Sequence, residues 1–370
     1  MKTDKELVYL IALSMVPAVG DINAKKLIAH LGSALAIFNQ PYRKLITIPG
    51  IGKTIAAHLC SKEFIYKAEE EFDYARKHGI EIKCYDDPEY PARLKECPDS
   101  PLLMYIKGNA NLNEAKILSV VGTRNITRRG KDICRSIIRD LAREFPGLII
   151  TSGLAYGVDI TAHKAALKEN LNTIAVLGHG FRTIYPSAHI TVAKQIISQG
   201  ALITDFPSAE GPERNNFLKR NRIIAGISDA TLIIESGRKG GAMVTADIAI
   251  SYNREVMAVP GSPDASYSEG CNLLIKSNRA ALIESADDIY YNLNWLKSKP
   301  GDKQQKLFPE NLSPLEEEIF GLINESEELS SDQISSSLGK PLHQLSSALL
   351  KLEFSGYIEN IPGNIYRKKN

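Results

Sequence analysis

The sequence predicts an α/β protein whose central part forms a doubly wound, mostly parallel sheet, with helical segments before it and after it. Short apolar runs alternate with amphipathic segments between about residues 110 and 295, and small residues or glycines follow most of the runs. Strands that are apolar throughout are buried on both faces, which is typical of parallel sheets covered by helices. The expected strands are Ile117–Val121, Leu148–Ile150, Thr173–Leu177, Ala201–Thr204, Ala230–Ile234 and Val256–Val259.

The length of 370 residues is consistent with two or three domains. Short helical segments separated by small-residue turns occupy the first 80 residues, and a polar segment with two prolines separates the central region from the C-terminal one. We therefore predict a helix-hairpin-helix (SAM-like) domain over 1–80, a Rossmann-like domain over 81–296, a linker over 297–311 and a winged-helix domain over 312–370.

The composition excludes several classes of protein. Hydrophobic residues make up 44% and charged residues 24%, with a net charge of only +2, so any phosphate-binding surface must be local. The five cysteines are scattered singly, which favours neither disulfides nor a metal site and fits a reducing cytoplasm. The apolar run at the N-terminus is too short and too polar for a signal peptide or a membrane span. We expect a cytoplasmic protein with no membrane contact.

Two similar turns, Val16–Gly20 and Ile48–Gly52, each precede a segment compatible with a helix. Glycine permits a tight turn, and the amides that open a helix can hold a phosphate oxygen, with Lys53 beside the second turn. The spacing resembles a pair of helix-hairpin-helix motifs. Proline and glycine are equally usual where a helical chain merely turns, so DNA contact and simple turning remain alternatives here.

The loops after the central strands carry the candidate binding groups, because ligands of such sheets bind outside the carboxyl ends of the strands. The first of these loops begins Gly122-Thr123-Arg124 and lacks the GxGxxG pattern, and no clear acidic residue follows the second strand. A dinucleotide is therefore not predicted, and no cofactor is expected. Helix-start amides together with the Arg124 guanidinium make an anion site. The alternative is a salt bridge that fastens the loop.

A basic segment with an aromatic residue, Phe217–Arg222, is expected to lie on a helix at the same edge of the sheet. Arg214 precedes it, and Arg238-Lys239 follows a later strand. Cations that track phosphates and a ring that stacks on a base are what single-stranded nucleic acid requires. A solvated helix face is the alternative, and the convergence of three basic sites on one edge favours nucleic-acid binding.

No catalytic set is predicted. Ser152, Asp159 and His163 are the residue types of a hydrolytic triad, but the last two lie four residues apart on one expected helix. His163 can simply bridge Asp159 there, and no G-x-S-x-G turn is present.

An ordered series of motifs resembles the DprA/Smf family of bacterial DNA-processing proteins over roughly residues 10–290. The motifs are Asp87–Leu94, Val121–Arg124, Ser152–Asp159, Ala162-His163, Ala175–Gly180, Tyr185-Pro186, Phe217–Gly226, Thr245-Ala246, Ala258–Gly261 and Gly270–Ile275. The chain departs from the family pattern at Thr204–Pro207, at Phe217-Leu218 and at Arg238–Gly241, which leaves the contacts of Asp205 and Lys239 open.

The resemblance implies a non-enzymatic protein that binds single-stranded DNA during natural transformation, protects it and helps to load the RecA recombinase. It also implies a homodimer formed through the Rossmann-like domain, with Arg124 and residues 217–222 as the main DNA contacts. With the other loop residues, the candidate DNA-binding set is Gly122, Thr123, Arg124, Ser152, Gly153, Gly157, Arg214, Phe217, Lys219, Arg220, Asn221, Arg222 and Lys239.

The C-terminal segment reads as three helices and a hairpin, the order found in a winged helix. Ser313-Pro314-Leu315-Glu316 fits a capping box with proline at the first helical position. Residues 312–370 hold nine acidic and five basic residues, which argues against simple duplex binding, since phosphate neutralisation dominates DNA affinity. A protein-binding or regulatory role is at least as well supported.

Two other functions remain alternatives. One is a nucleotide phosphoribohydrolase, whose family has a related sheet domain but carries a PGGxGT turn that Pro260–Pro263 and Arg238–Ala242 do not match. The other is a transcription regulator that reads duplex DNA through the winged helix. A preference for single-stranded DNA, a preference for duplex, or release of a base from a nucleotide would separate the three.

Overall fold

A large mixed sheet forms the centre of the computed structural model, which describes residues 2–113, 116–295, 312–326, 328–355, 357–361 and 363–368. The chain divides into two compact units, residues 1–298 and 299–370, which are considered separately. The predicted linker over 297–311 lies outside the described residues.

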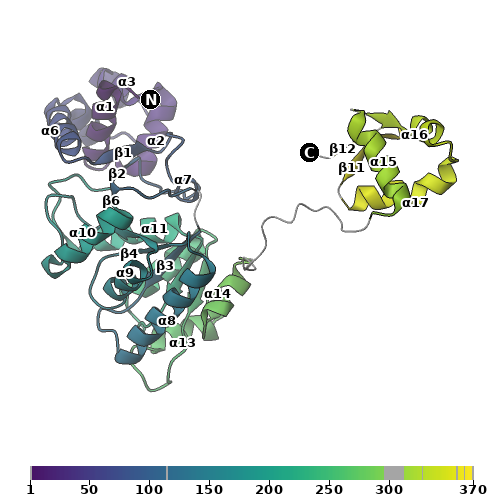
Figure 1. Ribbon diagram of the computed structural model, residues 1–370. Helices are drawn as coiled ribbons and strands as arrows, with labels where there is room; N and C mark the ends of the chain where they lie inside the picture. The colour runs from purple at the N-terminus through teal and green to yellow at the C-terminus, as the bar shows by residue number, and fades with distance from the viewer. Residues whose placement is uncertain are drawn as a thin grey trace. The chain divides into compact units, whose positions relative to one another are not determined.

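Within the described part of the first unit the sheet has nine strands in the order β1-β2-β6-β5-β4-β3-β7-β8-β9. Figure 1 shows β1, β2 and β6 below the N-terminal helices. The strands β3 to β9 pair in parallel, while β1 and β2 add an antiparallel edge. All six predicted strands are present with ends shifted by at most two residues, which confirms the doubly wound fold. The strands are β1 Glu81–Cys84, β2 Leu103–Gly108, β3 Ile117–Val121, β4 Ile149–Ser152, β5 Asn172–Val176, β6 Ala201–Thr204, β7 Ala230–Ile233, β8 Glu255–Ala258 and β9 Ala281–Leu282.

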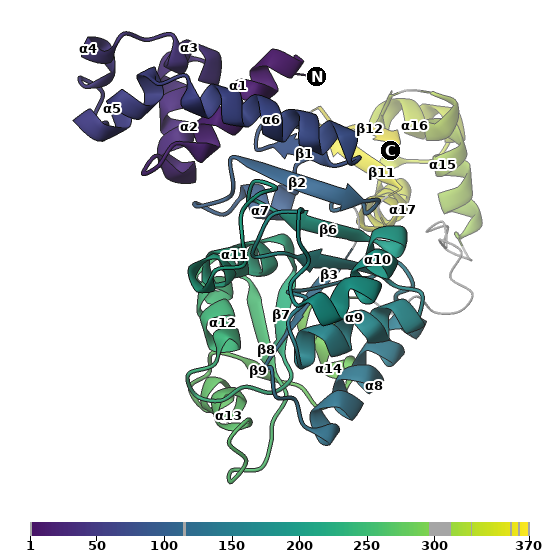
Figure 2. The same cartoon turned by 90° about the vertical axis from the view of Figure 1, so that its left-hand side faces the viewer.

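Helices cover both faces of this sheet (Figure 2). One layer contains α8 Arg128–Glu144, α9 Val158–Lys168, η1 Ser187–His189, α10 Ile190–Gln199 and α14 Ala286–Asn292. The other contains α7 Ala92–Lys95, α11 Arg214–Ile227, α12 Gly241–Ser251 and α13 Glu269–Lys276. The central strand shows why the runs are apolar throughout, because Ile117 and Val121 pack into one layer and Leu118 and Val120 into the other.

The helical N-terminal region belongs to the same compact unit as the sheet. Its helices are α1 Asp4–Met15, α2 Gly20–Leu31, α3 Ala34–Phe38, α4 Tyr42–Leu45, α5 Lys53–Cys60 and α6 Glu63–Lys77. The two predicted turns precede α2 and α5, and Gly20 and Gly50 adopt φ angles of 60° and 88°, which glycine accommodates readily. Leu103 and Tyr105 of β2 pack into the core of these helices, so the region is joined to the sheet edge by apolar contact.

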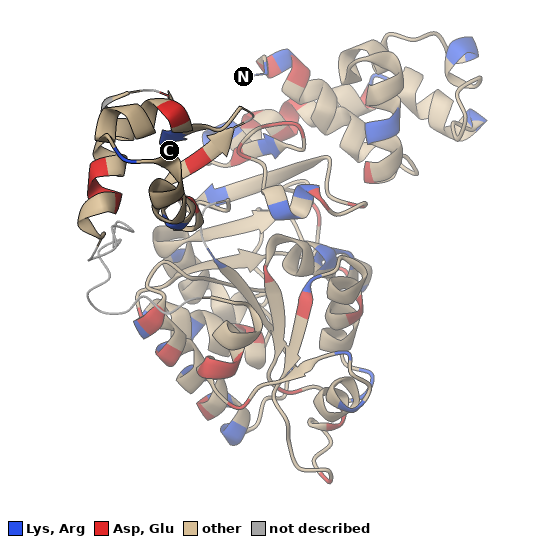
Figure 3. Cartoon of the chain, turned by 90° about the vertical axis from the view of Figure 1, so that its right-hand side faces the viewer, with Lys and Arg blue, Asp and Glu red and all other residues tan. Residues whose placement is uncertain are grey.

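The second unit has the predicted winged-helix order. Its elements are α15 Pro314–Glu325, β10 Leu329–Ser330, α16 Ser331–Leu338, α17 Leu342–Phe354, β11 Ile358–Ile361 and β12 Ile365–Lys368. Its strands form an antiparallel sheet in the order β10-β12-β11. The Ser313 side chain and the Glu316 side chain cap α15 reciprocally, as the sequence predicts. Charged residues of both signs are spread over both units (Figure 3). Across the described residues, no helix is both long enough and apolar enough to span a membrane.

Candidate nucleic-acid interface

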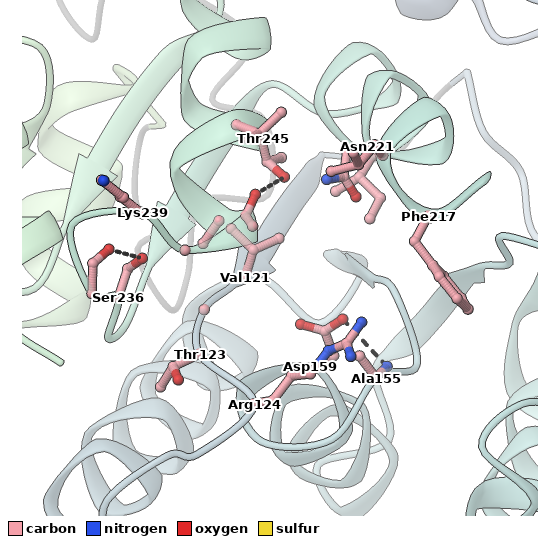
Figure 4. A pocket seen from close by; sticks show the side chains of 18 of the residues that line it. Val121, Thr123, Arg124, Ala155, Asp159, Phe217, Asn221, Ser236, Lys239 and Thr245 are labelled. Carbon is pink, nitrogen blue, oxygen red and sulfur yellow. Dashed lines mark hydrogen bonds between the residues drawn. The ribbon is translucent and has the colours of Figure 1, made fainter. Parts of the chain in front are cut away.

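A pocket of about 740 Å³ lies at the carboxyl ends of β3 and β7 (Figure 4). The chain continues from β3 to β4 on one side and later returns to β7 on the other, so the crossovers diverge between these two strands. A crevice forms at such a switch point because neither crossover connection covers the carboxyl ends of these two strands. The lining residues come from the loops after β3, β4, β7 and β8 and from the helices α11 and α12.

Glu235, at the end of β7, fixes the loop between β3 and α8. Its carbonyl accepts the Thr123 N–H at 2.7 Å, and its carboxylate accepts the Thr127 N–H at 2.8 Å and the Thr127 hydroxyl at 2.5 Å. Gly130 leaves room for this carboxylate, since a Cβ there would lie 2.5 Å from the Glu235 Cδ. The carboxylate thus also satisfies the amide at the Thr127 N-cap, and the loop is held with Arg124 on the outside.

Arg124 is exposed, and its guanidinium carbon lies 5.9 Å from the centre of the Phe217 ring. No ion pair involves Arg124 among the described residues, so the alternative of a loop-fastening salt bridge is not what the structure shows. A guanidinium over an aromatic face is attracted by the ring quadrupole and keeps its N–H groups available. Arg124 and Phe217 therefore form one composite surface with a cationic part and an aromatic part.

Phe217 is half-buried at the start of α11 and belongs to none of the apolar core clusters of the described residues. Gly178 allows the ring to settle, since a Cβ there would lie 2.6 Å from the Phe217 Cδ1, and the Tyr185 ring centre lies 5.7 Å away. Gly178 and the Tyr185 ring therefore contact the Phe217 ring, and part of the ring remains accessible to solvent. This placement suits stacking on a base better than a core role.

Two further cations line the pocket, Arg214 from the first turn of α11 and Lys239 from the loop before α12. Both are exposed, and neither forms an ion pair within the described part of the chain. The N-cap of α12, Gly240, provides no side-chain cap, so the first-turn amides are not satisfied from that residue. Exposed cations beside helix-start amides are the groups that favour an anion.

Arg220, which was predicted as a DNA contact, lies in the buried floor of the pocket. It is only 4% exposed, and its Nη1 donates to the carbonyl oxygens of Gly153, at 2.8 Å, and of Val176. Burial lowers the pKa of Arg220 to about 10, while the charge of Asp159 opposes that shift. Burial raises the pKa of Asp159, against the charge of Arg220. The Arg220 and Asp159 side chains form the buried, charged bottom of the pocket. Through its hydrogen bond to Gly153, Arg220 links the loop after β4 to α11.

Arg222 and Lys219, which were also predicted as DNA contacts, do not line this pocket. Successive helical residues are about 100° apart, so these two point away from Phe217 and line a second pocket of about 810 Å³ beside α2. There the Arg222 guanidinium pairs with Asp21 at 3.0 Å and with Asp205. Burial works to lower the pKa of Arg222, but the two carboxylates outweigh it and raise the value. Arg222 therefore fastens the N-terminal region to the sheet.

Three other predicted residues shape the site without lining it. The buried Ser152 hydroxyl donates to the Val120 carbonyl at 2.6 Å, and Gly153 is packed against the Arg220 guanidinium. Gly157 has a φ of 81°, and a Cβ there would lie 2.1 Å from the Thr123 carbonyl oxygen. Of the thirteen candidates, eight line the pocket: Gly122, Thr123, Arg124, Arg214, Phe217, Arg220, Asn221 and Lys239.

Tyr267 is a lining residue that the sequence did not single out. It lies between β8 and α13, and its hydroxyl accepts a hydrogen bond from the Asn125 side chain at 3.1 Å. The only signal in the sequence is that this loop also follows a strand. Its reach to the loop after β3 depends on strand order, which the sequence pattern does not contain.

The residue types of a triad are not arranged as one. His163 is buried, its Nδ1 lies 2.8 Å from the Thr173 hydroxyl, and burial lowers its pKa to about 3. The Ser152 hydroxyl is engaged with a backbone carbonyl. Over the ranges that the structure describes, no group of three or more His, Cys, Asp and Glu residues could hold a metal ion.

The fold and the site together define an α/β protein with a basic switch-point pocket, followed by a winged helix. The sequence matches the DNA recombination-mediator protein A family over residues 81–294 and the DprA winged helix domain over residues 304–364. The chain belongs to the DNA recombination-mediator protein A family.

Relatives cover most of the chain. Protein Smf of Synechocystis sp. is 31% identical over 99% of this chain and 100% of its own length, and Protein Smf of Escherichia coli is 35% identical over 76% of each chain. The crystal structure of DNA processing protein A from Streptococcus pneumoniae has a TM-score of 0.63 at 26% identity and covers 78% of this chain and 98% of that one. DNA processing protein A from Helicobacter pylori, studied for its single-stranded DNA binding mode, has a TM-score of 0.52 at 26% identity and covers 58% of this chain and 95% of that one.

Proposed function

We propose that this protein binds single-stranded DNA in the switch-point pocket. The observation that carries the proposal is the exposed Arg124 guanidinium over the accessible Phe217 ring, with Lys239 and Arg214 on the adjoining walls. A phosphate fits between cations that have no carboxylate partner, and an unpaired base fits on the ring. The single-stranded DNA binding mode described for the Helicobacter pylori relative supports the same ligand.

Beyond binding, we propose that the protein acts in recombination during natural transformation, where it protects incoming DNA and helps to load RecA. The recombination-mediator description of the family supports this role. A cytoplasmic homodimer formed through the sheet domain completes the proposal, and binding rather than catalysis is the activity we assign. We also propose that the chain is divided into a helix-hairpin-helix domain over 1–80, a Rossmann-like domain over 81–296, a linker over 297–311 and a winged-helix domain over 312–370.

The winged helix offers little to a duplex reader. The helix α17 exposes the apolar side chains Leu342, Leu350 and Phe354, and residues 312–370 carry more acidic than basic residues. Reading a duplex requires cations that neutralise phosphates. These features favour a protein partner for the second unit over the transcription-regulator alternative.

Replacing Arg124 with alanine tests the proposed site. A hydrogen bond to a charged group contributes about 1.5–3 kcal/mol, so affinity for an oligo-dT should fall roughly 10- to 150-fold. The salt dependence should flatten by about 0.7 of a slope unit for one lost phosphate contact. Fluorescence anisotropy across a salt series measures both quantities.

Lys194→Ala is a matched control, because Lys194 is an exposed cation on α10 outside the pocket lining. It should leave affinity and salt slope unchanged, and duplex of the same length should bind more weakly than the single strand to the unmodified protein. An Arg124→Ala protein that remains folded and binds as tightly as the unmodified protein would rule out the site.

A further inference from the structure

The exposed face of α8 carries a row of cations that the pocket does not use. At 100° per residue, Arg128, Lys131 and Arg135 lie within about 60° of one another around the helix, on a face that adjoins the buried row containing Cys134 and Ile138. All three cations are exposed. We call these three residues the α8 basic stripe.

The stripe begins where the pocket ends. Arg128 comes four positions after Arg124, so even a fully extended chain would place their Cα atoms no more than about 14 Å apart. The hydrogen bonds between Thr127 and Glu235 fix the start of α8 against the end of β7, and Arg129 Nη2 donates to the Pro260 carbonyl at 3.4 Å. The first turn of α8 is therefore held beside the loops that form the pocket.

The cations of the stripe are not balanced by nearby carboxylates. The first two turns hold Arg128, Arg129, Lys131 and Arg135 against the single carboxylate Asp132. Of these four cations only Arg135 has an acidic partner within the described part of the chain, Asp132 at 3.7 Å. Both side chains of that pair are 62% exposed, and ion pairs between exposed side chains contribute little to stability.

The position of these cations opposes helix stability. The first turn of α8 contains no acidic residue, although the partial positive charge of a helix N-terminus favours acidic side chains there. Like charges three or four residues apart also repel one another. Further along the same helix, Arg139 and Arg143 both pair with Asp140. Unpaired charge is thus concentrated at the end next to the pocket, where it costs the helix stability and is explained by an anionic ligand.

We propose that the α8 basic stripe binds the phosphates of the same single strand whose neighbouring nucleotides occupy the pocket. The proposal rests on the proposed function and extends the site from the loops onto the exposed face of α8. A single strand is favoured over a duplex because a base on Phe217 must be unpaired, and the backbone that leaves the ring beside Arg124 meets Arg128 next.

The test compares oligonucleotide lengths in the full chain. The triple variant Arg128→Ala/Lys131→Ala/Arg135→Ala should bind a four-nucleotide oligo-dT, which is long enough only for the pocket, like the unmodified protein. For a twenty-nucleotide oligo-dT its salt slope should fall by about 2 units, from three lost contacts at about 0.7 each on a single strand. Between 50 and 200 mM salt, the variant should therefore lose about 20-fold less affinity than the unmodified protein does.

The control is Arg139→Ala/Arg143→Ala, which removes two cations of the same helix that are paired with Asp140. It should leave the salt slope for the long oligonucleotide nearly unchanged. Thermal unfolding of the triple variant should occur at the same temperature as for the unmodified protein or higher, since unfavourable N-terminal charges are removed.

An unchanged slope for the long oligonucleotide, an equal loss for short and long ones, or a loss confined to duplex would each overturn the α8 proposal. Failure of the pocket itself looks different, because the unmodified protein would not bind the short oligonucleotide and Arg124→Ala would have no effect. The two proposals can therefore fail independently.

Discussion

Replacing Arg222 with alanine should destabilise the protein rather than remove a DNA contact. Its guanidinium pairs with Asp205 and Asp21 and donates to the Asp99 carbonyl, with only 13% of the side chain exposed. Removing it leaves the Asp205 carboxylate, whose side chain is 10% exposed, without its cation. Breaking a buried ion pair in this way costs about 3–5 kcal/mol.

The loss of stability in Arg222→Ala can be measured as a fall in the melting temperature. For a domain of some 250 residues about 2 °C is lost per kcal/mol, so the midpoint should fall by about 6–10 °C. Affinity for single-stranded DNA, measured well below that midpoint, should stay within a few-fold of the unmodified protein. The exposed neighbour Lys219→Ala should change the midpoint little, as surface substitutions usually stay within about 0.5 kcal/mol.

A double variant separates the pair from general damage to the helix. Arg222→Ala/Asp205→Ala removes the stranded carboxylate together with its cation, so its destabilisation should be smaller than the sum of the two single losses. A normal melting temperature combined with a large loss of DNA affinity in Arg222→Ala would refute this reasoning and restore Arg222 to the binding surface.

Three further predictions follow from the same contacts. Phe217→Ala should weaken oligonucleotide binding by about 1–3 kcal/mol with less destabilisation than the 3–5 kcal/mol typical of a buried aromatic, and the reverse pattern in parallel titrations and melts would make the ring a core residue. Because burial lowers the pKa of His163 from 6.5 to about 3, the unfolded chain binds a proton in that window that the folded one does not. Stability should fall by up to about 1.4 kcal/mol per pH unit between pH 6.5 and 3, and His163→Gln, compared by urea titration at each pH, should show a shallower fall, whereas parallel curves would contradict this. Deleting residues 312–370 should leave a cooperatively melting protein with single-strand binding intact, and loss of binding in that folded protein would move the site to the winged helix.

The antiparallel edge of the sheet shows where sequence patterns stop being informative. The strand β1 reads EIKC, four residues that are mostly half-exposed, and it pairs with β2 some twenty residues later. The strand β2 does contain an apolar run, residues 103–106, although it was not among the predicted strands. Met104 and Ile106 pack into the sheet core, and Leu103 and Tyr105 pack against the N-terminal helices. The parallel strands were predictable because burial on both faces requires apolar residues at every position.

The sequence alone determined six strands of the parallel sheet, the doubly wound fold, the winged helix and the set of loops that meet at one edge. Periodicity encodes which residues are buried, and turn residues encode where the elements end. It also identified Arg124 and Phe217, which the structure brings together at 5.9 Å.

Only the tertiary structure decided which of the neighbouring arginines is available to a ligand. Arg220 finds the Gly153 carbonyl 67 residues away, and Arg222 finds Asp21 201 residues away, so both are engaged inside the protein. Arg124 and Arg128 find no carboxylate among the described residues and remain exposed. The reason is physical: a cation's role depends on the charges packed against it, and these come from elements far away along the chain.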